Sequence, residues 1–236
     1  MIKALLTASA LVLSTGAPAF TALTIDPASP DTIELLGPVS FRQVSPLVDA
    51  ILDRAGKTKE ITMVINSPGG EVMSGLHLIN VMQMAKSRGT KFRCVSTFLA
   101  ASMAMQIFAA CDSRYALNGT YLLFHPVRVS FGGGLFGGTT TLTPRLAKDL
   151  YIDLERLEKI LVSDLRTWLP MKASTFFHHY HAETFWLAKE LDREVPNWLT
   201  VVDDIVGVKT LDMDKSNKDE AEGRFNYIWS GTGVAL

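Results

Sequence analysis

The chain has 236 residues, of which 47% are hydrophobic and 20% charged, and its formal net charge is −1 at pH 7. A chain of this length can bury a substantial core as one α/β domain, and its hydrophobic content excludes an intrinsically disordered protein. The near-neutral charge offers no electrostatic footprint for nucleic acid or an anionic membrane. These bulk properties favour a globular protein without a nucleic-acid partner.

The first 19 residues have the pattern of an export signal. Lys3 supplies a positive charge, an apolar run extends from Ala4 to Leu13, and Ala17 and Ala19 are small residues of the kind that a signal peptidase reads. The pattern predicts cleavage after Ala19 and a periplasmic or secreted protein. The alternatives are a buried N-terminal helix or an uncleaved membrane anchor, although a membrane-spanning helix needs roughly 20 apolar residues.

The chain has two cysteines, Cys94 and Cys111. An oxidising compartment permits a disulfide between them, but both lie in apolar segments, where buried free thiols are common. The sequence does not determine whether their Cα atoms lie within the ~7 Å that a bridge requires. We therefore expect free thiols and leave the bridge open. There is no CxxC motif and no zinc-ligand spacing, and we expect neither a metal nor a cofactor.

The first half of the chain alternates strands with helices. Apolar residues recur at helical spacing between 45 and 55, whereas 61–66 is mostly apolar and β-rich, which is typical of a strand buried on both faces of a parallel sheet. A turn at Gly69-Gly70 follows that strand. In chain order the pattern predicts strand 33–36, helix 45–55, strand 61–66, helix 72–86 and strand 92–97.

The second half continues this alternation. The predicted elements are a buried apolar helix over 103–111, strands 114–117 and 121–124, a Gly- and Thr-rich extended segment over 130–141, a long amphipathic helix over 144–169 and a helix near 185–191 that leads to the stretch 201–206. Such alternation implies a largely parallel sheet with right-handed crossovers. Residues 20–210 are expected to form one domain, followed by a polar tail over 211–236.

Ser102 and His125 are the candidate nucleophile and general base. Ser102 begins the predicted helix 103–111, and His125 follows the predicted strand 121–124. A serine hydroxyl is a weak nucleophile until an imidazole within hydrogen-bond reach takes its proton. Taken alone, Ser102 is explained by helix capping and His125 by a core position. Both follow consecutive parallel strands, however, and these strands end at the sheet edge where α/β sites form.

Two backbone amides are candidates for an oxyanion hole. Glycine allows close approach of a substrate and exposes backbone N–H groups, so the Gly69-Gly70 turn can supply one donor through Gly70. Met103, directly after Ser102, can supply the second. The alternative is an ordinary tight turn, since Pro-Gly-Gly sequences are common in turns.

Four motifs in order carry a family resemblance. They are Ile65-Asn66-Ser67-Pro68-Gly69-Gly70, Ala100-Ala101-Ser102-Met103, Arg114-Tyr115-Ala116-Leu117 and His125-Pro126. Together they resemble the Clp protease proteolytic subunit family over about Ile33 to Val208. The resemblance implies a crotonase-like ββα spiral of the α/β class. It also implies that Ser102 is the nucleophile, that His125 is the base, and that Gly70 and Met103 form the oxyanion hole.

The same resemblance suggests further assignments. The segment from Ser130 to Leu169 is similar to the handle through which the family pairs two seven-membered rings. Glu183 stands where the family places the aspartate of its catalytic triad, so it would orient His125. We also expect Gly69, Gly132 and Gly133 to contact substrate. The three neighbouring histidines lack metal-ligand spacing and are interpreted as surface residues; they are His178, His179 and His181.

The sequence therefore predicts an exported, ATP-independent serine endopeptidase that cleaves peptides or unfolded proteins through an acyl-enzyme. A homo-oligomeric ring is expected, without the ATP-driven unfoldase that serves the family in the cytosol. The alternatives are a catalytically silent ring subunit or binding scaffold, a crotonase-type acyl-CoA enzyme, and a Ser/Lys signal-peptide peptidase. The Ser102/His125 pair disfavours all three.

Overall fold

The computed structural model describes residues 21–128 and 144–207. Several sequence predictions lie outside these residues: the signal segment 1–19, the extended segment 130–141 with Gly132 and Gly133, and the polar tail 211–236. They remain predictions.

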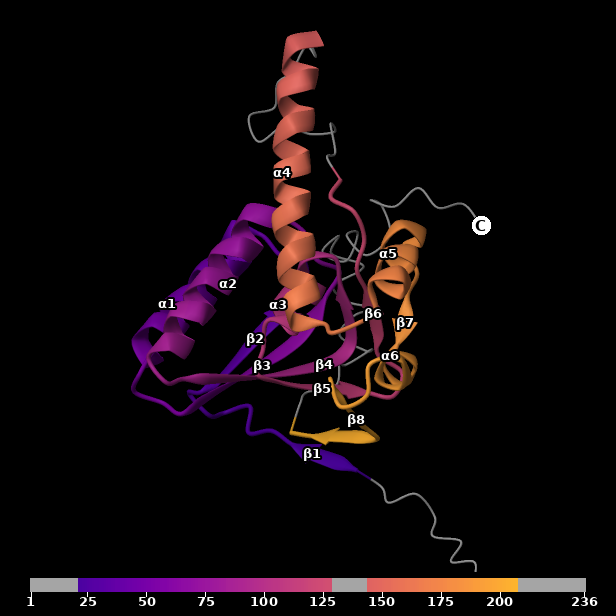
Figure 1. Cartoon of the computed structure of the whole chain (residues 1–236). Helices are drawn as coiled ribbons and strands as arrows, with labels where there is room; N and C mark the ends of the chain where they lie inside the picture. The colour runs from indigo at the N-terminus through magenta and orange to yellow at the C-terminus, as the bar shows by residue number, and fades with distance from the viewer. Residues whose placement is uncertain (1–20, 129–143, 208–236) are drawn as a thin grey trace, which may run out of the picture.

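A seven-stranded sheet forms the centre of the molecule (Figure 1). Its main path runs in the order β2-β3-β4-β5-β8, and every pair on this path is parallel. Two further strands extend it: β6 pairs in parallel with β4, and β7 pairs antiparallel with β6. The strands are β2 (Thr32–Leu36), β3 (Glu60–Ser67), β4 (Lys91–Ala101), β5 (Ser113–Leu117), β6 (Tyr121–Leu123), β7 (Trp186–Leu187) and β8 (Thr200–Val202).

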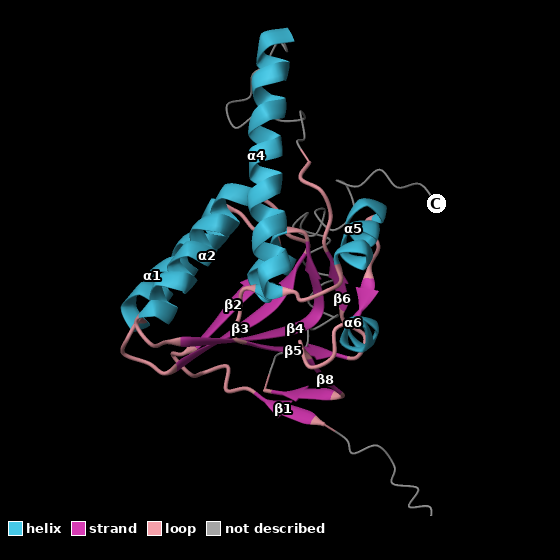
Figure 2. Ribbon diagram, viewed as in Figure 1, coloured by secondary structure: helices cyan, strands magenta, loops and turns pink. Residues whose placement is uncertain are grey.

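Helices cover one face of this sheet, as Figure 2 shows. The first of them, α1, begins where the Ser40 hydroxyl accepts a hydrogen bond from the Gln43 N–H, and it buries an apolar stripe at helical spacing against the core. The helices are α1 (Phe41–Arg54), α2 (Val72–Ser87), α3 (Met103–Ala109), α4 (Pro144–Trp168), α5 (Ala173–Ala182) and α6 (Ala188–Glu194). All seven residues of α3 are buried, which makes it the central helix of the core.

A small parallel sheet of β1 (Ala22–Thr24) and β9 (Asp204–Val206) covers part of the opposite face. Strand β3 shows why both faces need cover. Ile61, Met63 and Ile65 enter the main core, whereas Val64 packs with Val95 and Ile25 in a separate cluster. Because successive side chains of a strand point to opposite faces, a nearly all-apolar strand requires a layer on each side.

Strand β4 is long enough to pair with two strands in succession. Its first part pairs with β5 from Arg93 to Ser96, and its last part pairs with β6 from Leu99 to Ala101. A register irregularity in the β3–β4 pairing, between Ile65 and Ser67, accompanies this change. The arrangement places the end of β4 directly beside the end of β6, where the candidate site lies.

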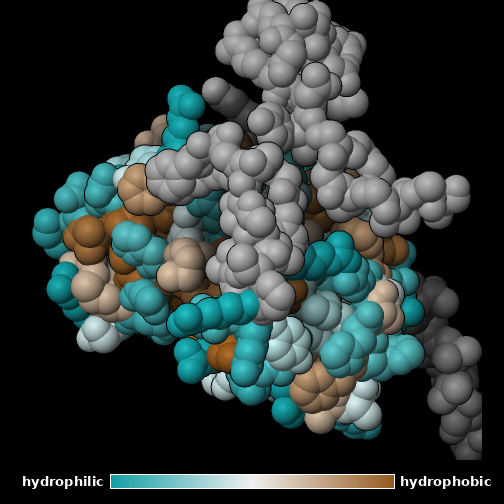
Figure 3. Space-filling model, turned by 90° about the horizontal axis from the view of Figure 1, so that it is seen from above, coloured by the Kyte–Doolittle hydropathy of each residue, from teal (hydrophilic) through white to brown (hydrophobic). Residues whose placement is uncertain are grey.

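Helix α4 projects from the sheet beyond the other helices (Figure 1). Among the side chains of α4 whose burial the structure describes, the buried ones, Leu161 and Leu165, lie in its C-terminal part. Figure 3 views the molecule from above, along the direction in which α4 projects. Groups of hydrophobic residues lie between hydrophilic ones on the surface seen there. Within the described residues, no helix is both long enough and apolar enough to cross a membrane.

The predicted mixed α/β fold with a parallel sheet is confirmed, and most predicted elements lie within a few residues of the observed ones. Some local features differ from the sequence predictions. Strand β1 and helix α5 were not predicted, the predicted helix 185–191 begins as strand β7, and the stretch 201–206, to which no element was assigned, holds most of β8 and all of β9. These short segments are defined by partners distant in sequence, so their own residues carry a weak signal.

The expectation of free thiols was also wrong, because Cys94 and Cys111 form a disulfide with a Cα–Cα distance of 6.0 Å. Cys94 lies within β4, and Cys111 follows α3 by two residues. The connection that leaves β4 through α3 returns to β5, where Arg114 pairs with Cys94. Tertiary structure therefore brings together two cysteines separated by 17 positions.

Candidate active site

Ser102 lies at the turn from β4 into α3. Its backbone has φ 56° and ψ −124°, in a region that residues other than glycine rarely adopt, and its hydroxyl makes no capping hydrogen bond to the helix. The Ser102 N–H donates to the carbonyl oxygen of Leu123 at 2.8 Å. A strained strand-to-helix turn of this kind is typical of nucleophilic serines, and helix capping does not explain the hydroxyl.

His125 emerges at the same sheet edge, because Ala101 at the end of β4 pairs with Leu123 at the end of β6. Its Nδ1 lies 2.7 Å from the carbonyl oxygen of Pro126. A carbonyl oxygen can only accept a hydrogen bond, so Nδ1 carries the proton and Nε2 keeps a free lone pair. This is the tautomer that a general base acting through Nε2 requires.

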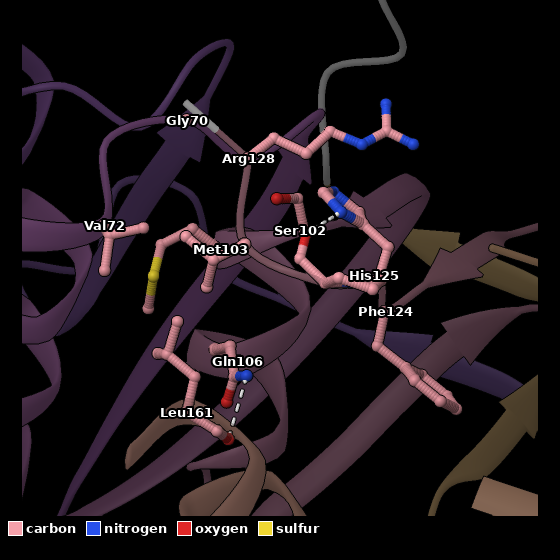
Figure 4. Close-up of a pocket in the computed structure, with 11 residues that line it drawn as sticks. Gly70, Val72, Ser102, Met103, Gln106, Phe124, His125, Arg128 and Leu161 are labelled. Atoms are coloured by element: carbon pink, nitrogen blue, oxygen red, sulfur yellow. Dashed lines mark hydrogen bonds between the residues drawn. The ribbon is translucent and has the colours of Figure 1, made fainter. Parts of the chain in front are cut away.

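One cavity of about 210 Å³ brings four predicted site residues together: Gly70, Ser102, Met103 and His125 (Figure 4). The other lining residues are Val72, Gln106, Phe124, Pro126, Val127, Arg128 and Leu161. Among the described residues, no hydrogen bond joins the Ser102 hydroxyl to the His125 ring, whose Nδ1 is paired with Pro126. The shared cavity is a property of the fold, whereas the catalytic roles remain predictions.

The Gly69-Gly70 turn packs against the serine turn. A Cβ atom on Gly69 would lie 2.5 Å from the Ala101 oxygen, 2.6 Å from the Ser102 Cβ and 2.8 Å from the Met103 nitrogen. Gly69 also has φ 88°, which disfavours any side chain there. On Gly70, at φ 150°, a Cβ would collide with the Val39 oxygen. Glycine at position 69 therefore allows the close approach of the two turns, and glycine at position 70 allows the approach of the backbone to Val39.

The N–H groups of Gly70 and Met103 remain available as donors. Around the glycine turn, the Val39 N–H donates to the Gly69 carbonyl oxygen and the Glu71 N–H donates to the Val39 carbonyl oxygen. Met103 is the first residue of α3, and the first N–H groups of a helix have no acceptor within the helix. Among the described residues neither amide has a hydrogen-bond partner. Two such amides beside a serine hydroxyl are suited to stabilise a negatively charged oxygen.

Glu183 follows the last residue of α5, where it adopts a left-handed conformation with φ 52°. Its carboxylate forms an ion pair with Arg128, a residue that lines the cavity. His125 Nδ1 is occupied by Pro126. Glu183 is thus linked to the cavity by its ion pair with Arg128. That Glu183 orients His125 remains a prediction.

Burial lowers the pKa of His125 below its ordinary value of 6.5; the bond to Pro126 opposes this shift and the positive charge of Arg128 adds to it. A base must be neutral to accept a proton, so a lowered pKa keeps it functional in more acidic solution. We expect the acidic limb of kcat/KM for peptide hydrolysis to have its midpoint below pH 6.5.

The variant Arg128→Gln tests the cause of this pH dependence. Removing the positive charge, and with it the partner of Glu183, raises the pKa of His125, so the acidic limb moves to higher pH. The exposed Arg42 of α1 offers the matched control Arg42→Gln, which leaves the limb in place. A midpoint that is the same in all three proteins would refute the electrostatic coupling.

Sequence reasoning missed two polar residues of the cavity, Gln106 and Arg128. Gln106 is the one side chain with an amide in the segment from Met103 to Cys111, which the pattern assigns simply to an apolar helix. A polar residue amid buried apolar ones is a usable signal that a partner exists. Arg128 follows the His125-Pro126 motif by two residues and carries no comparable signal.

The fold is a mixed α/β domain with a parallel sheet, consistent with the crotonase fold, and its cavity brings together the predicted site residues. Residues 32–143 match the family model described as Clp protease. The matched segment makes up slightly less than half of the chain, and over it the chain is similar to Clp proteolytic subunits.

Two relatives indicate the distance of this homology. The ATP-dependent Clp protease proteolytic subunit of Streptococcus mutans is 33% identical over 135 residues, which is 55% of this chain and 65% of that protein. The same subunit of Streptococcus equi subsp. equi is 31% identical over 138 residues, covering 56% and 66%. The match thus covers slightly less than two thirds of these relatives. Glu183 lies beyond the segment that the family model matches.

Proposed function

We propose that this chain is an ATP-independent serine endopeptidase that hydrolyses peptides or unfolded proteins through an acyl-enzyme. The observation that carries the proposal is the shared cavity in which Ser102, at its strained turn, meets His125 and the free amides of Gly70 and Met103. An ordinary helix cap or core histidine requires none of these features.

The proposed mechanism follows from the positions of these groups. Ser102 Oγ attacks the scissile carbonyl carbon while His125 Nε2 takes the hydroxyl proton, and the Gly70 and Met103 N–H groups bind the oxygen that becomes negative. His125 then gives the proton to the leaving amine, and water hydrolyses the ester by the reverse sequence. For Glu183 to act as the orienting acid, its carboxylate must exchange Arg128 for His125 Nδ1–H.

The proposal includes export to the periplasm or the exterior. The signal-like segment 1–19 supports it, and so does the Cys94–Cys111 disulfide, since such bridges persist mainly in oxidising compartments. An exported subunit would lack ATP and an unfoldase. Retention by an uncleaved N-terminal segment is the alternative.

A homo-oligomeric ring is also part of the proposal. Leu154 and Leu157 remain only half-buried on α4, and Ile160 is 49% exposed. An apolar face of this kind on a projecting helix is suited to contact another copy of the chain.

A fluorophosphonate probe tests the function directly. The folded protein, without nucleotide, is expected to react with the probe at Ser102, as identified by mass spectrometry of the labelled peptide, and to cleave a fluorogenic peptide that the probe then inhibits. Absence of both labelling and cleavage in the folded protein would favour the scaffold. Labelling at another serine would remove Ser102 as the nucleophile.

A further inference from the structure

Gln106 carries an unsatisfied hydrogen-bond acceptor beside the cavity. The residue is 7% exposed, in the middle of the fully buried helix α3. Its Nε2 donates to the carbonyl oxygen of Leu161 on α4 at 3.2 Å, as Figure 4 shows. Its Oε1 is buried and has no hydrogen-bond partner among the described residues.

The orientation of this amide is determined by its neighbour. The Leu161 carbonyl can only accept, so the NH₂ group of Gln106 must face it, and exchanging the nitrogen and oxygen would place two acceptors together. Oε1 is therefore the free atom. Proteins rarely leave a buried acceptor unpaired, because the lost hydration is not replaced, and a bound ligand can restore the missing bond.

The walls around Gln106 restrict what that ligand can be. Val72, Phe124 and Leu161 give the cavity an apolar lining. Apart from His125, which can titrate, the charged residue of the lining is Arg128. Its side chain is 56% exposed and forms an ion pair with Glu183. A charged side chain that entered the cavity would be desolvated without an opposite free charge, which costs much free energy. The cavity thus suits an apolar group that ends in an uncharged donor.

Resting on the proposed function, we propose that Gln106 is a specificity-determining residue of this peptidase. It favours substrates whose side chain on the acyl side of the scissile bond has an apolar body and a terminal O–H or N–H, with tyrosine as the type case. Ser102 and Met103 line the same cavity, so the side chain next to the attacked carbonyl is the one that reaches it. Phenylalanine fills the same space but leaves Oε1 unpaired.

The test compares three fluorogenic peptides that differ only at this position: tyrosine, phenylalanine and O-methyltyrosine. The methyl ether keeps the oxygen but has no donor. Wild type is expected to prefer tyrosine over phenylalanine in kcat/KM by roughly tenfold, the effect of one hydrogen bond to a buried group. O-methyltyrosine is expected to be cleaved no better than phenylalanine.

Variants identify the source of this preference. In Gln106→Leu the tyrosine-to-phenylalanine ratio is expected to fall to about one or lower, because the substrate hydroxyl then has no acceptor. Gln106→Met, with an unbranched side chain, is the second variant should leucine impair folding. The matched control Gln83→Leu makes the same change on an exposed position of α2 and keeps the wild-type ratio.

The outcomes separate this inference from the proposed function. A wild type that reacts with the fluorophosphonate and cleaves tyrosine and phenylalanine peptides equally would overturn the role of Gln106 and leave the peptidase function standing. A tyrosine preference that survives in Gln106→Leu would also overturn it. A protein that neither reacts with the probe nor cleaves any peptide overturns both proposals.

Discussion

Replacing Ser102 by alanine is expected to lower kcat for peptide hydrolysis by roughly 10⁴-fold to 10⁶-fold, the range typical for removal of a catalytic serine. The residual rate comes from the oxyanion-hole amides and substrate binding, which the change leaves in place. The free energy of unfolding should change by less than about 0.5 kcal/mol. The reason is that the Ser102 hydroxyl makes no cap bond to α3, so its loss removes no structural interaction.

Ser40→Ala is the matched control for this variant. Ser40 is the N-cap of α1, and its hydroxyl accepts a hydrogen bond from the Gln43 N–H at 3.4 Å. Its replacement should cost about 1 kcal/mol of stability while activity is retained. Urea denaturation and peptide hydrolysis, measured on both variants, distinguish the two roles. If Ser102→Ala lost stability like Ser40→Ala and kept its activity, Ser102 would be a helix cap and the proposed mechanism would fail.

Removing the disulfide with the double variant Cys94→Ala/Cys111→Ala is expected to destabilise the protein by about 3 kcal/mol. The two cysteines are 17 positions apart, and a loop of that size gives roughly this value when its closure no longer restricts the unfolded chain. Both side chains are buried, so the smaller alanines add a cost of lost packing. The measurement is the urea midpoint of the variant against oxidised wild type.

Reductant gives this experiment an internal control. When reductant is present during unfolding, the stability of wild type should fall most of the way to that of the double variant. The stability of the double variant should not change with reductant. The closed loop contains Ser102 and Met103, so the bridge also tethers the candidate nucleophile between β4 and α3. Equal midpoints for oxidised wild type, reduced wild type and the double variant would show that the bridge contributes nothing.

The sequence alone determined the class of the fold and the centre of the candidate site. Apolar runs such as 61–66 are compatible with few structures other than buried parallel strands, and strand ends necessarily meet at one edge of a parallel sheet. This physical constraint predicted that Ser102 and His125 would lie near one another. The Gly69-Gly70 turn was recognisable from its two glycines. In the structure other backbone atoms lie so close to both positions that any residue with a Cβ would collide with them.

Tertiary structure alone decided the features that depend on partners distant in the chain. The ion pair of Glu183 with Arg128, the Cys94–Cys111 bridge and the unpaired acceptor of Gln106 each involve positions that no local pattern connects. Their geometry follows from the pairing of β4 with both β5 and β6 and from the docking of α4 against α3. Periodicity reports which face of an element is buried, but only packing determines which atoms meet there.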